Sequence, residues 1–294
     1  MDGFFRRLPR FEYLSPGTLE EALSLLEEYK GKAGVIAGGT DLLVQMKNRE
    51  AAPEYLISLK NISGLDYINY RESDGLRLGA LTTIESVENS PVVRDKYSVL
   101  AQATRSMASA QIRNVATVAG NICTAVPSAD TAPALIVLGA KLNLISTEDK
   151  RTVAVEEFFT GPCQTILSDT ELVAEIHLPD TAPDIKGVYL KYGLRRAMNL
   201  ATVGVAVMIN LEGEYCREIR VALGAVAPVP LRAIGAETIL RGQALSNDVI
   251  EEAARVASEE ARPISDIRAS AEYRRELVRV MTRRAIKQAC GQAT

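Results

Sequence analysis

The sequence predicts an α+β protein with two domains, and three observations support this prediction. The chain has 294 residues, which is long for a single domain. Its first part reads as strand, helix and strand, with a pair of glycines directly after a strand. Its last part runs through several strands before two helices, which is typical of an antiparallel sheet covered by helices.

Composition excludes several classes of protein. Hydrophobic residues make up 47% and charged residues 24% of the chain, as in a globular protein that buries sizeable cores. A formal net charge of −3 argues against nucleic-acid binding. No apolar run is long enough to span a bilayer, so we expect no membrane insertion. The N-terminus lacks a basic start followed by an apolar core, and we therefore expect a cytoplasmic protein.

Cysteine and histidine usage argues against metal chemistry on this chain. The four cysteines are Cys123, Cys163, Cys216 and Cys290. None forms a C-x-x-C pair, so we expect reduced thiols and neither a zinc site nor an iron–sulfur cluster. The single histidine, His177, lies in an alternating run and is expected to occupy an ordinary strand position. The sequence therefore indicates no metal ligands and no catalytic acid or base.

The opening of the chain is predicted from a capping box and two apolar runs. Thr18 and Glu21 have the spacing at which each side chain satisfies an amide at the start of a helix. That helix is expected to extend to about Tyr29. The runs 34–37 and 55–59 are predicted strands, so a glycine turn follows the first of them.

Turn signals and alternation predict the elements that follow. Residues 65–81 are expected to form a hairpin, and a second capping box beginning at Thr82 is expected to open helices over 83–110. The remaining predicted strands are 141–146, 152–155, 171–178, 186–192, 202–211 and 218–226. Residues 179–184 are a predicted linker, and helices are predicted over about 247–261 and 271–289. The arginines of that last helix are spread over more than one face, which favours a structural helix over a basic patch.

Two glycine-containing loops are the candidate binding elements. Gly38, Gly39 and Thr40 can turn consecutive backbone N–H groups toward one point, forming an anion nest. Gly120 and Asn121 belong to a second such loop, which also includes Thr117. Neither loop contains a lysine, which suits a diphosphate held by neutral donors, and Asp130 is then better placed near hydroxyls than near phosphate. The alternative for the Gly-Gly pair is a simple tight turn.

Three longer motifs resemble one protein family. They are AGGTDLLVQMK at 37–47, RNVATVAGNICTAVPSADTAPAL at 113–135 and RPISDIRASAEYRRELVRVMTRRAI at 262–286. Together they resemble the FAD-binding medium subunit of molybdenum hydroxylases, a family that includes xanthine dehydrogenase, carbon monoxide dehydrogenase and 4-hydroxybenzoyl-CoA reductase. The resemblance extends over about 7–287, nearly the whole chain.

The resemblance implies a particular domain arrangement. A two-lobed FAD-binding domain of the vanillyl-alcohol-oxidase type is expected over 1–178, with lobes over about 1–60 and 61–178. A small domain of an antiparallel sheet plus helices is expected over 185–289.

The resemblance also implies the cofactor contacts. The corresponding residues are Val35, Ile36, Ala37, Gly38, Gly39, Thr40, Asp41, Leu42, Met107, Thr117, Val118, Ala119, Gly120, Asn121, Asp130, Leu172 and Lys191. A cation at Lys191, near the isoalloxazine, would favour the anionic reduced flavin, and a solvated strand lysine is the alternative. One departure is Ala119, where the family often has glycine; alanine there is costly if the backbone needs a positive φ.

The implied function is electron transfer within a larger complex. FAD on this chain would pass electrons between [2Fe–2S] clusters of a small partner subunit and NAD or another external acceptor or donor. A large partner subunit with molybdopterin would carry the chemistry of the organic substrate. The alternatives are a stand-alone FAD-dependent oxidase or reductase, and a scaffold that has lost its cofactor.

Overall fold

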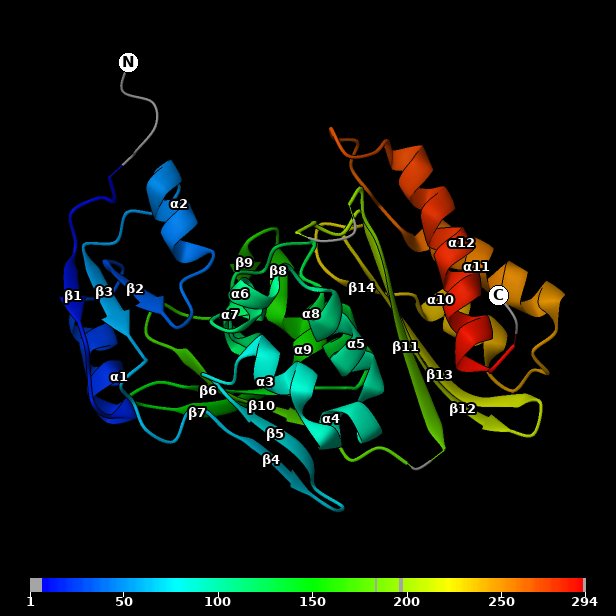
Figure 1. Ribbon diagram of the computed structural model, residues 1–294, viewed down its shortest axis with the longest axis horizontal. Helices are drawn as coiled ribbons and strands as arrows, with labels where there is room; N and C mark the ends of the chain where they lie inside the picture. Colours follow the sequence, from blue (N-terminus) through cyan, green and yellow to red (C-terminus); the bar gives the residue numbers. More distant parts are fainter. Residues whose placement is uncertain (1–6, 183, 196–197, 293–294) are drawn as a thin grey trace.

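The chain folds into a small parallel sheet, a larger antiparallel sheet and a C-terminal antiparallel sheet, in that order. The computed structural model describes residues 7–182, 184–195 and 198–292. Figure 1 shows the N-terminal lobe (blue) at one end, a group of short helices in the middle, and the C-terminal sheet between those helices and the last three helices. In these described ranges, no helix has the length and apolarity required to cross a bilayer.

The N-terminal lobe is a three-stranded parallel sheet with the strand order β1-β3-β2. Its elements are β1 (Glu12–Leu14), α1 (Leu19–Glu28), β2 (Ala33–Ile36), α2 (Leu42–Asn48) and β3 (Tyr55–Ser58). The Thr18 hydroxyl accepts from the N–H of Glu21 at 3.1 Å, as the capping box predicts. The Glu21 carboxylate accepts from the N–H of Gly17 at 2.8 Å, one residue before the expected donor.

The second lobe is a five-stranded antiparallel sheet with the order β4-β5-β10-β6-β7. Its strands are β4 (Ile68–Arg71), β5 (Gly75–Gly79), β6 (Lys141–Ile145), β7 (Lys150–Ala154) and β10 (Leu172–Leu178), with a small hairpin of β8 (Phe159–Gly161) and β9 (Gln164–Thr165). Its helices are α3 (Ile84–Asn89), α4 (Pro91–Lys96), α5 (Ser98–Ser106), α6 (Ala110–Arg113), α7 (Val118–Cys123), α8 (Thr131–Val137) and α9 (Val155–Phe158).

The second capping prediction is wrong by one residue. Thr83, and not Thr82, caps α3, and its hydroxyl accepts from the N–H of Ser86 at 3.1 Å. Thr82 is fully buried, and its hydroxyl donates to the carbonyl of Tyr67 at 2.7 Å. Thr82 therefore makes a hydrogen bond to a separate segment of the chain and does not cap the helix, as the local sequence pattern had predicted.

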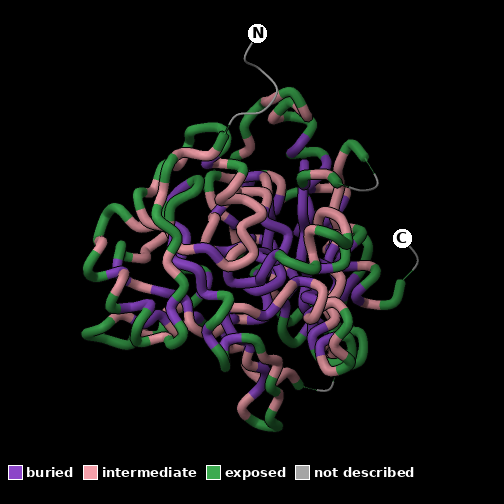
Figure 2. Tube along the Cα trace, turned by 60° about the vertical axis from the view of Figure 1, so that its left-hand side comes forward, coloured by how far each residue is buried: buried purple, intermediate pink, exposed green. Residues whose placement is uncertain are grey.

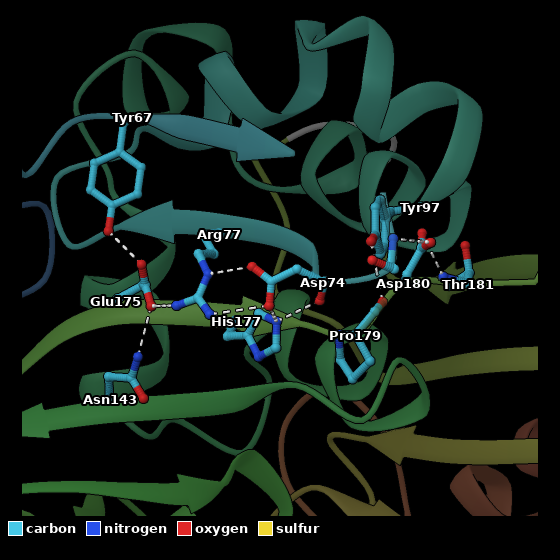
Figure 3. A network of polar contacts seen from close by, with 11 residues as sticks. Tyr67, Asp74, Arg77, Tyr97, Asn143, Glu175, His177, Pro179, Asp180 and Thr181 are labelled. Carbon is cyan, nitrogen blue, oxygen red and sulfur yellow. Dashed lines mark hydrogen bonds and ion pairs between the residues drawn. The ribbon is translucent and has the colours of Figure 1, made fainter. Parts of the chain in front are cut away.

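Polar side chains form a network on one face of this second sheet (Figure 3). The Glu175 carboxylate accepts from the Tyr67 hydroxyl, the Arg77 guanidinium and the Asn143 amide, each at 2.7 Å. His177 Nε2 lies 2.8 Å from the carbonyl oxygen of Asp74, and His177 is part of β10, as predicted. The network joins neighbouring strands β5, β10 and β6 through side chains that alternate with those buried under the helices.

The predicted linker over 179–184 has no helix or strand among its described residues, yet it is held in place (Figure 3). The Asp180 carboxylate accepts from the Tyr70 hydroxyl at 3.0 Å and from the N–H of Ser73 at 3.1 Å. The Ser73 N–H beside Asp180 holds the pKa of that carboxyl below its usual value. The Tyr97 hydroxyl donates to the carbonyl of Pro179 at 3.2 Å.

The C-terminal sheet has the order β11-β12-β13-β14 and is antiparallel. Its elements are β11 (Ile185–Tyr192), β12 (Val203–Glu212), β13 (Tyr215–Gly224) and β14 (Leu231–Arg232), followed by α10 (Ile234–Leu240), α11 (Asn247–Glu260) and α12 (Ala271–Ala289). Most of β12 is buried without alternation, which is expected of a strand that is covered on both faces.

The two faces of this sheet contribute to different cores. Tyr189, Ala206 and Met208 pack in one cluster with residues of α5 and α8. Val205 and Val207 pack in another cluster with residues of α10, α11 and α12. Figure 2 shows the buried residues gathered in the middle of the molecule and the exposed residues at its edges.

Candidate cofactor-binding site

A cavity of about 330 Å³ lies between the N-terminal lobe and the second lobe. Every residue of 35–42 lines it, from the end of β2 to the start of α2. Other predicted site residues that line the same cavity are Met107, Thr117, Ala119, Gly120, Asn121 and Leu172. The structure therefore brings together residues that lie far apart in the sequence and were assigned to one site.

The first loop depends on its glycines for geometry. Gly39 has a φ of +72°, a conformation that side chains disfavour. A Cβ atom on Gly38 would lie 2.1 Å from the carbonyl oxygen of Val115, in the segment that precedes α7. The loop can lie against that segment only because residue 38 has no side chain.

The backbone N–H groups of this loop are available to a ligand. Those of residues 38–41 make no hydrogen bond to a backbone or side-chain acceptor in the part of the chain that the structure describes. Successive unpaired N–H groups at a turn are the donors of an anion nest. The loop thus fits a phosphate-bearing group without a lysine or arginine.

The second loop is the start of α7. The Thr117 hydroxyl accepts from the N–H of Gly120 at 2.9 Å and caps the helix. Ala119 lies inside α7 and is not among the residues with positive φ, so alanine at this position carries no backbone strain. Val118 does not line the cavity, because its side chain is fully buried in the core of the second lobe.

Asn121 presents a side-chain donor to the first cavity. Its Oδ1 accepts from the Thr131 hydroxyl at 2.6 Å, which fixes the orientation of the amide. Its Nδ2 has no hydrogen-bond partner among the residues described, and the side chain lines the cavity. A second cavity, of about 240 Å³, shares Asn121 and Thr40 with the first and is lined by Asp130.

Asp130 and Lys191 form a buried ion pair beside these cavities. Lys191 Nζ lies 2.7 Å from Asp130 Oδ2 and also donates to the carbonyl of Ser106 at 3.1 Å. The Tyr189 hydroxyl donates to Asp130 Oδ1 at 2.8 Å. Burial raises the pKa of Tyr189 well above its usual value, so the phenol stays protonated and remains a donor. Lys191 lines neither cavity, and its charge is balanced by Asp130 rather than directed into the first cavity.

Comparison with known proteins identifies the family. The family described as FAD binding domain in molybdopterin dehydrogenase matches residues 9–181, more than half of the chain. The chain belongs to the FAD-binding medium subunits of molybdenum hydroxylases. A second family, the CO dehydrogenase flavoprotein C-terminal domain, matches residues 188–289. The α+β fold and the FAD cofactor predicted from the sequence are thereby confirmed.

The relatives of this medium subunit match it over nearly their whole length. The putative xanthine dehydrogenase FAD-binding subunit XdhB of Escherichia coli K12 is 33% identical over 282 residues, 96% of each chain. The carbon monoxide dehydrogenase medium chain of Hydrogenophaga pseudoflava is 34% identical over 281 residues, 96% of this chain and 97% of the relative. Among solved structures, the H. pseudoflava carbon monoxide dehydrogenase that lacks the Mo-pyranopterin moiety has a chain with a TM-score of 0.94 at 34% identity. This match covers 98% of the present chain and 100% of the other.

The charged groups that line the first cavity are acidic. Its lining within the described residues includes Asp41 and Glu171 and has no lysine or arginine. Burial raises the pKa of Asp41. Hydrogen bonds from the Arg151 guanidinium, at 2.6 and 2.9 Å, lower the pKa of Glu171 to about 2. Glu171 is therefore ionised and paired, which makes it unsuited to proton transfer.

Several residues in and around the first cavity were not predicted. Thr124 and Cys163 line the cavity, and Tyr189 holds Asp130. Tyr189 had a readable signal, because it lies two residues before Lys191 and so shares a face of the same strand. All four cysteines are free thiols, as predicted, and burial raises the pKa of Cys123 to about 12.

Proposed function

We propose that this medium subunit passes electrons through FAD between [2Fe–2S] clusters of a small partner subunit and an external acceptor or donor, with NAD as one candidate. A large partner subunit with molybdopterin would carry the organic reaction. Family membership supports the general role. The direction of electron flow, the partners and the residue assignments are part of the proposal.

One observation carries the assignment of the diphosphate site. Unpaired N–H groups of residues 38–41 and the free Nδ2 of Asn121 belong to the same cavity, which has no cationic lining among the described residues. Such donors bind a diphosphate by hydrogen bonding and place no fixed positive charge beside it. In the adjoining cavity, Asp130 is suited to accept from a hydroxyl of the cofactor rather than to approach its phosphates.

The residues of the chain would bind and orient the cofactor. FAD, when bound, supplies the redox chemistry that connects one-electron and two-electron carriers. Met107 and Leu172 add apolar surface to the same cavity. Of the two acids in the described lining, Glu171 is held by Arg151 and is not free to transfer a proton. This arrangement favours electron transfer over a complete substrate reaction on this chain.

Stopped-flow absorbance of the flavin tests the proposal. The isolated chain, loaded with FAD, should be reduced by dithionite but should not bleach rapidly with purines, aldehydes or aromatic thioesters. Adding an iron–sulfur subunit and a molybdopterin subunit of the same complex should restore bleaching by the substrate of the complex. Rapid bleaching of the isolated chain by an organic substrate would instead establish a stand-alone enzyme. Acid precipitation should release all of the flavin as FAD, because no tether is expected.

A further inference from the structure

The helix α5 lies along one edge of the strand β11 (Figure 1). This strand is the first in the order β11-β12-β13-β14, so within the described chain only its other edge pairs with a strand. A Cβ atom on Gly187 would lie 2.9 Å from the Val99 Cβ and 3.4 Å from the Val99 backbone nitrogen. The absence of a side chain at Gly187 therefore lets the backbone of α5 come close to the strand.

The Gln102 side chain occupies this edge in the way that a neighbouring strand would. Its Oε1 accepts from the backbone N–H of Tyr189 at 2.9 Å, and its Nε2 donates to the carbonyl of Gly187 at 3.3 Å. A side-chain amide carries both a donor and an acceptor, so it can satisfy one N–H and one C=O of an open strand edge. Tyr189 is 6% exposed, and a buried N–H without a partner would cost free energy.

The contacts of α5 reach both residues that hold Asp130. Tyr189 and Lys191 are two positions apart on β11 and share a face of the strand. Their side chains donate to the two oxygens of the Asp130 carboxylate, at 2.8 and 2.7 Å. The carbonyl of Ser106, the last residue of α5, accepts from Lys191 Nζ at 3.1 Å. The helix thus supports Tyr189 through Gln102 and Lys191 through Ser106.

Ser98 distinguishes this role from simple covering of the strand edge. Its hydroxyl donates to the Gly187 carbonyl at 3.2 Å, the same acceptor that Gln102 uses. Gly187 therefore has two donors on α5, whereas among the described residues Gln102 alone accepts from the N–H of Tyr189. The contact that belongs to Gln102 alone is made to the residue whose hydroxyl orients Asp130.

We propose that Gln102 is a positioning residue for the cofactor. It fixes the backbone of Tyr189 and, through the Tyr189 hydroxyl, holds the Asp130 carboxylate in the orientation that receives a hydroxyl of FAD. This inference rests on the proposed function, which places Asp130 in the FAD site. Gln102 lines neither cavity of that site, and lies instead in a separate cavity of about 430 Å³ with Arg94 and Arg105. It therefore acts on the cofactor only through Tyr189.

Fluorescence titration of the full chain with FAD is the first test. Gln102→Leu is similar in size but has no amide, and its Kd should be about three- to tenfold higher, as expected for one lost hydrogen bond. Ser98→Ala is the matched control on the same helix, and it should bind FAD like the wild type because the contact to Tyr189 remains.

Gln102→Glu is the conservative variant that should rescue binding. It keeps an acceptor for the N–H of Tyr189, and its charge lies in the cavity that Arg94 and Arg105 also line. A loss in Gln102→Glu equal to that in Gln102→Leu would assign the effect to Gly187 and overturn the proposal. Gln102→Met, which is unbranched and also cannot bond to Tyr189, replaces the leucine variant if that variant does not fold.

A double-mutant cycle identifies the route of the effect. Tyr189→Phe removes the hydroxyl that donates to Asp130 and should raise the Kd on its own. Gln102→Leu should then cause no further rise in the Tyr189→Phe background, because the orientation that it protects is already lost. An undiminished effect in that background would show that Gln102 acts through general packing of α5, and would overturn the proposal. Wild-type binding by Gln102→Leu, or an equal loss in Ser98→Ala, would overturn it as well.

Asp130→Asn separates the failure of this inference from the failure of the assignment on which it rests. If Asp130→Asn weakens FAD binding and Gln102→Leu does not, the positioning role fails alone. If Asp130→Asn leaves the Kd unchanged, the proposed place of Asp130 in the FAD site fails, and the positioning role fails with it.

Discussion

Lys191 on the C-terminal sheet and Asp130 in the second lobe form an ion pair, with 2.7 Å between Nζ and Oδ2. Both side chains are largely withdrawn from water, with 11% and 7% of their surface exposed. Replacing Lys191 by Met would leave the Asp130 carboxylate with Tyr189 as its remaining described donor. The free energy of unfolding should fall by about 3 kcal/mol, because Asp130, whose pKa burial already raises, must then stay buried without its cation or take up a proton.

Urea unfolding of the FAD-free chain measures this loss. Lys191→Met/Asp130→Asn serves as the control, since it removes both charges and should cost less than the two single changes added together. Additive costs would show that the two residues act independently. In that case Lys191 would be a separate contact and not the partner of Asp130.

Asn121→Ala should weaken FAD binding without unfolding the chain. The variant loses the Nδ2 donor that lines both cavities, and hydrogen bonds to charged groups contribute about 1.5–3 kcal/mol. Fluorescence titration should therefore report a Kd about ten- to a hundredfold higher. Asn69→Ala, an exposed change on β4, should leave the Kd unaltered. An unchanged Kd in Asn121→Ala would assign Asn121 to the packing of Thr131 alone.

Gly38→Ala should open the cofactor site. Its Cβ would meet the Val115 carbonyl oxygen at 2.1 Å, a backbone atom that cannot rotate away. The two loops must separate, and we expect a loss of about 1–3 kcal/mol in stability together with a loss of bound FAD. Gly17→Ala is the control, since its nearest neighbour in the structure is a flexible Glu21 oxygen at 3.9 Å. Normal flavin content in Gly38→Ala would mean that the loops do not need this close approach.

Glu171→Gln should remove a contribution to stability that depends on pH. The pKa of Glu171 is about 2 in the folded chain and about 4.5 ordinarily, so the ionised carboxylate stabilises the fold above that ordinary value. This contribution is lost as the pH falls from about 5 to about 2. Arg151 is partly exposed, so water screening limits the contribution to about 1 kcal/mol.

Thermal unfolding of the wild type and of Glu171→Gln across that pH range checks the direction of this pH dependence. The two proteins should differ at pH 7 and converge toward pH 2. Glu148→Gln, at an exposed position, should track the wild type throughout. A difference that persists undiminished in acid would mean that the substitution acts through packing and not through charge.

Sequence reasoning succeeded where the determining chemistry is local. The pair Gly38-Gly39 follows a strand and Thr18 precedes a helix, and both features act within a few residues. It failed where the role of a side chain is determined by a group far away in the sequence. The Thr82 hydroxyl, which the local pattern assigned to a helix cap, instead donates to the Tyr67 carbonyl fifteen positions away.

Short elements were also hard to predict. The strands β1 and β14 have three and two residues, too few for a periodic signal, and neither was predicted. The helix α10 was missed for the same reason, since it spans seven residues. The two glycine loops stood out in the sequence because they carry uncommon residues, and the structure brings both to one cavity. The signal for Tyr189 was weaker, because it consisted only of its position two residues before Lys191 on the same strand.

The C-terminal sheet has consequences for protein engineering and for gene fusion in this family. The first family match ends at residue 181 and the second begins at residue 188, which suggests dividing the chain between them. Such a cut would remove Tyr189, Ala206 and Met208 from α5 and α8 and leave apolar helix faces in water. A chimera that exchanges only the C-terminal part must therefore keep this inner face complementary to its new neighbour. The border between the two matches is a border of sequence similarity that the shared core crosses, and we expect the parts on either side of it to unfold together.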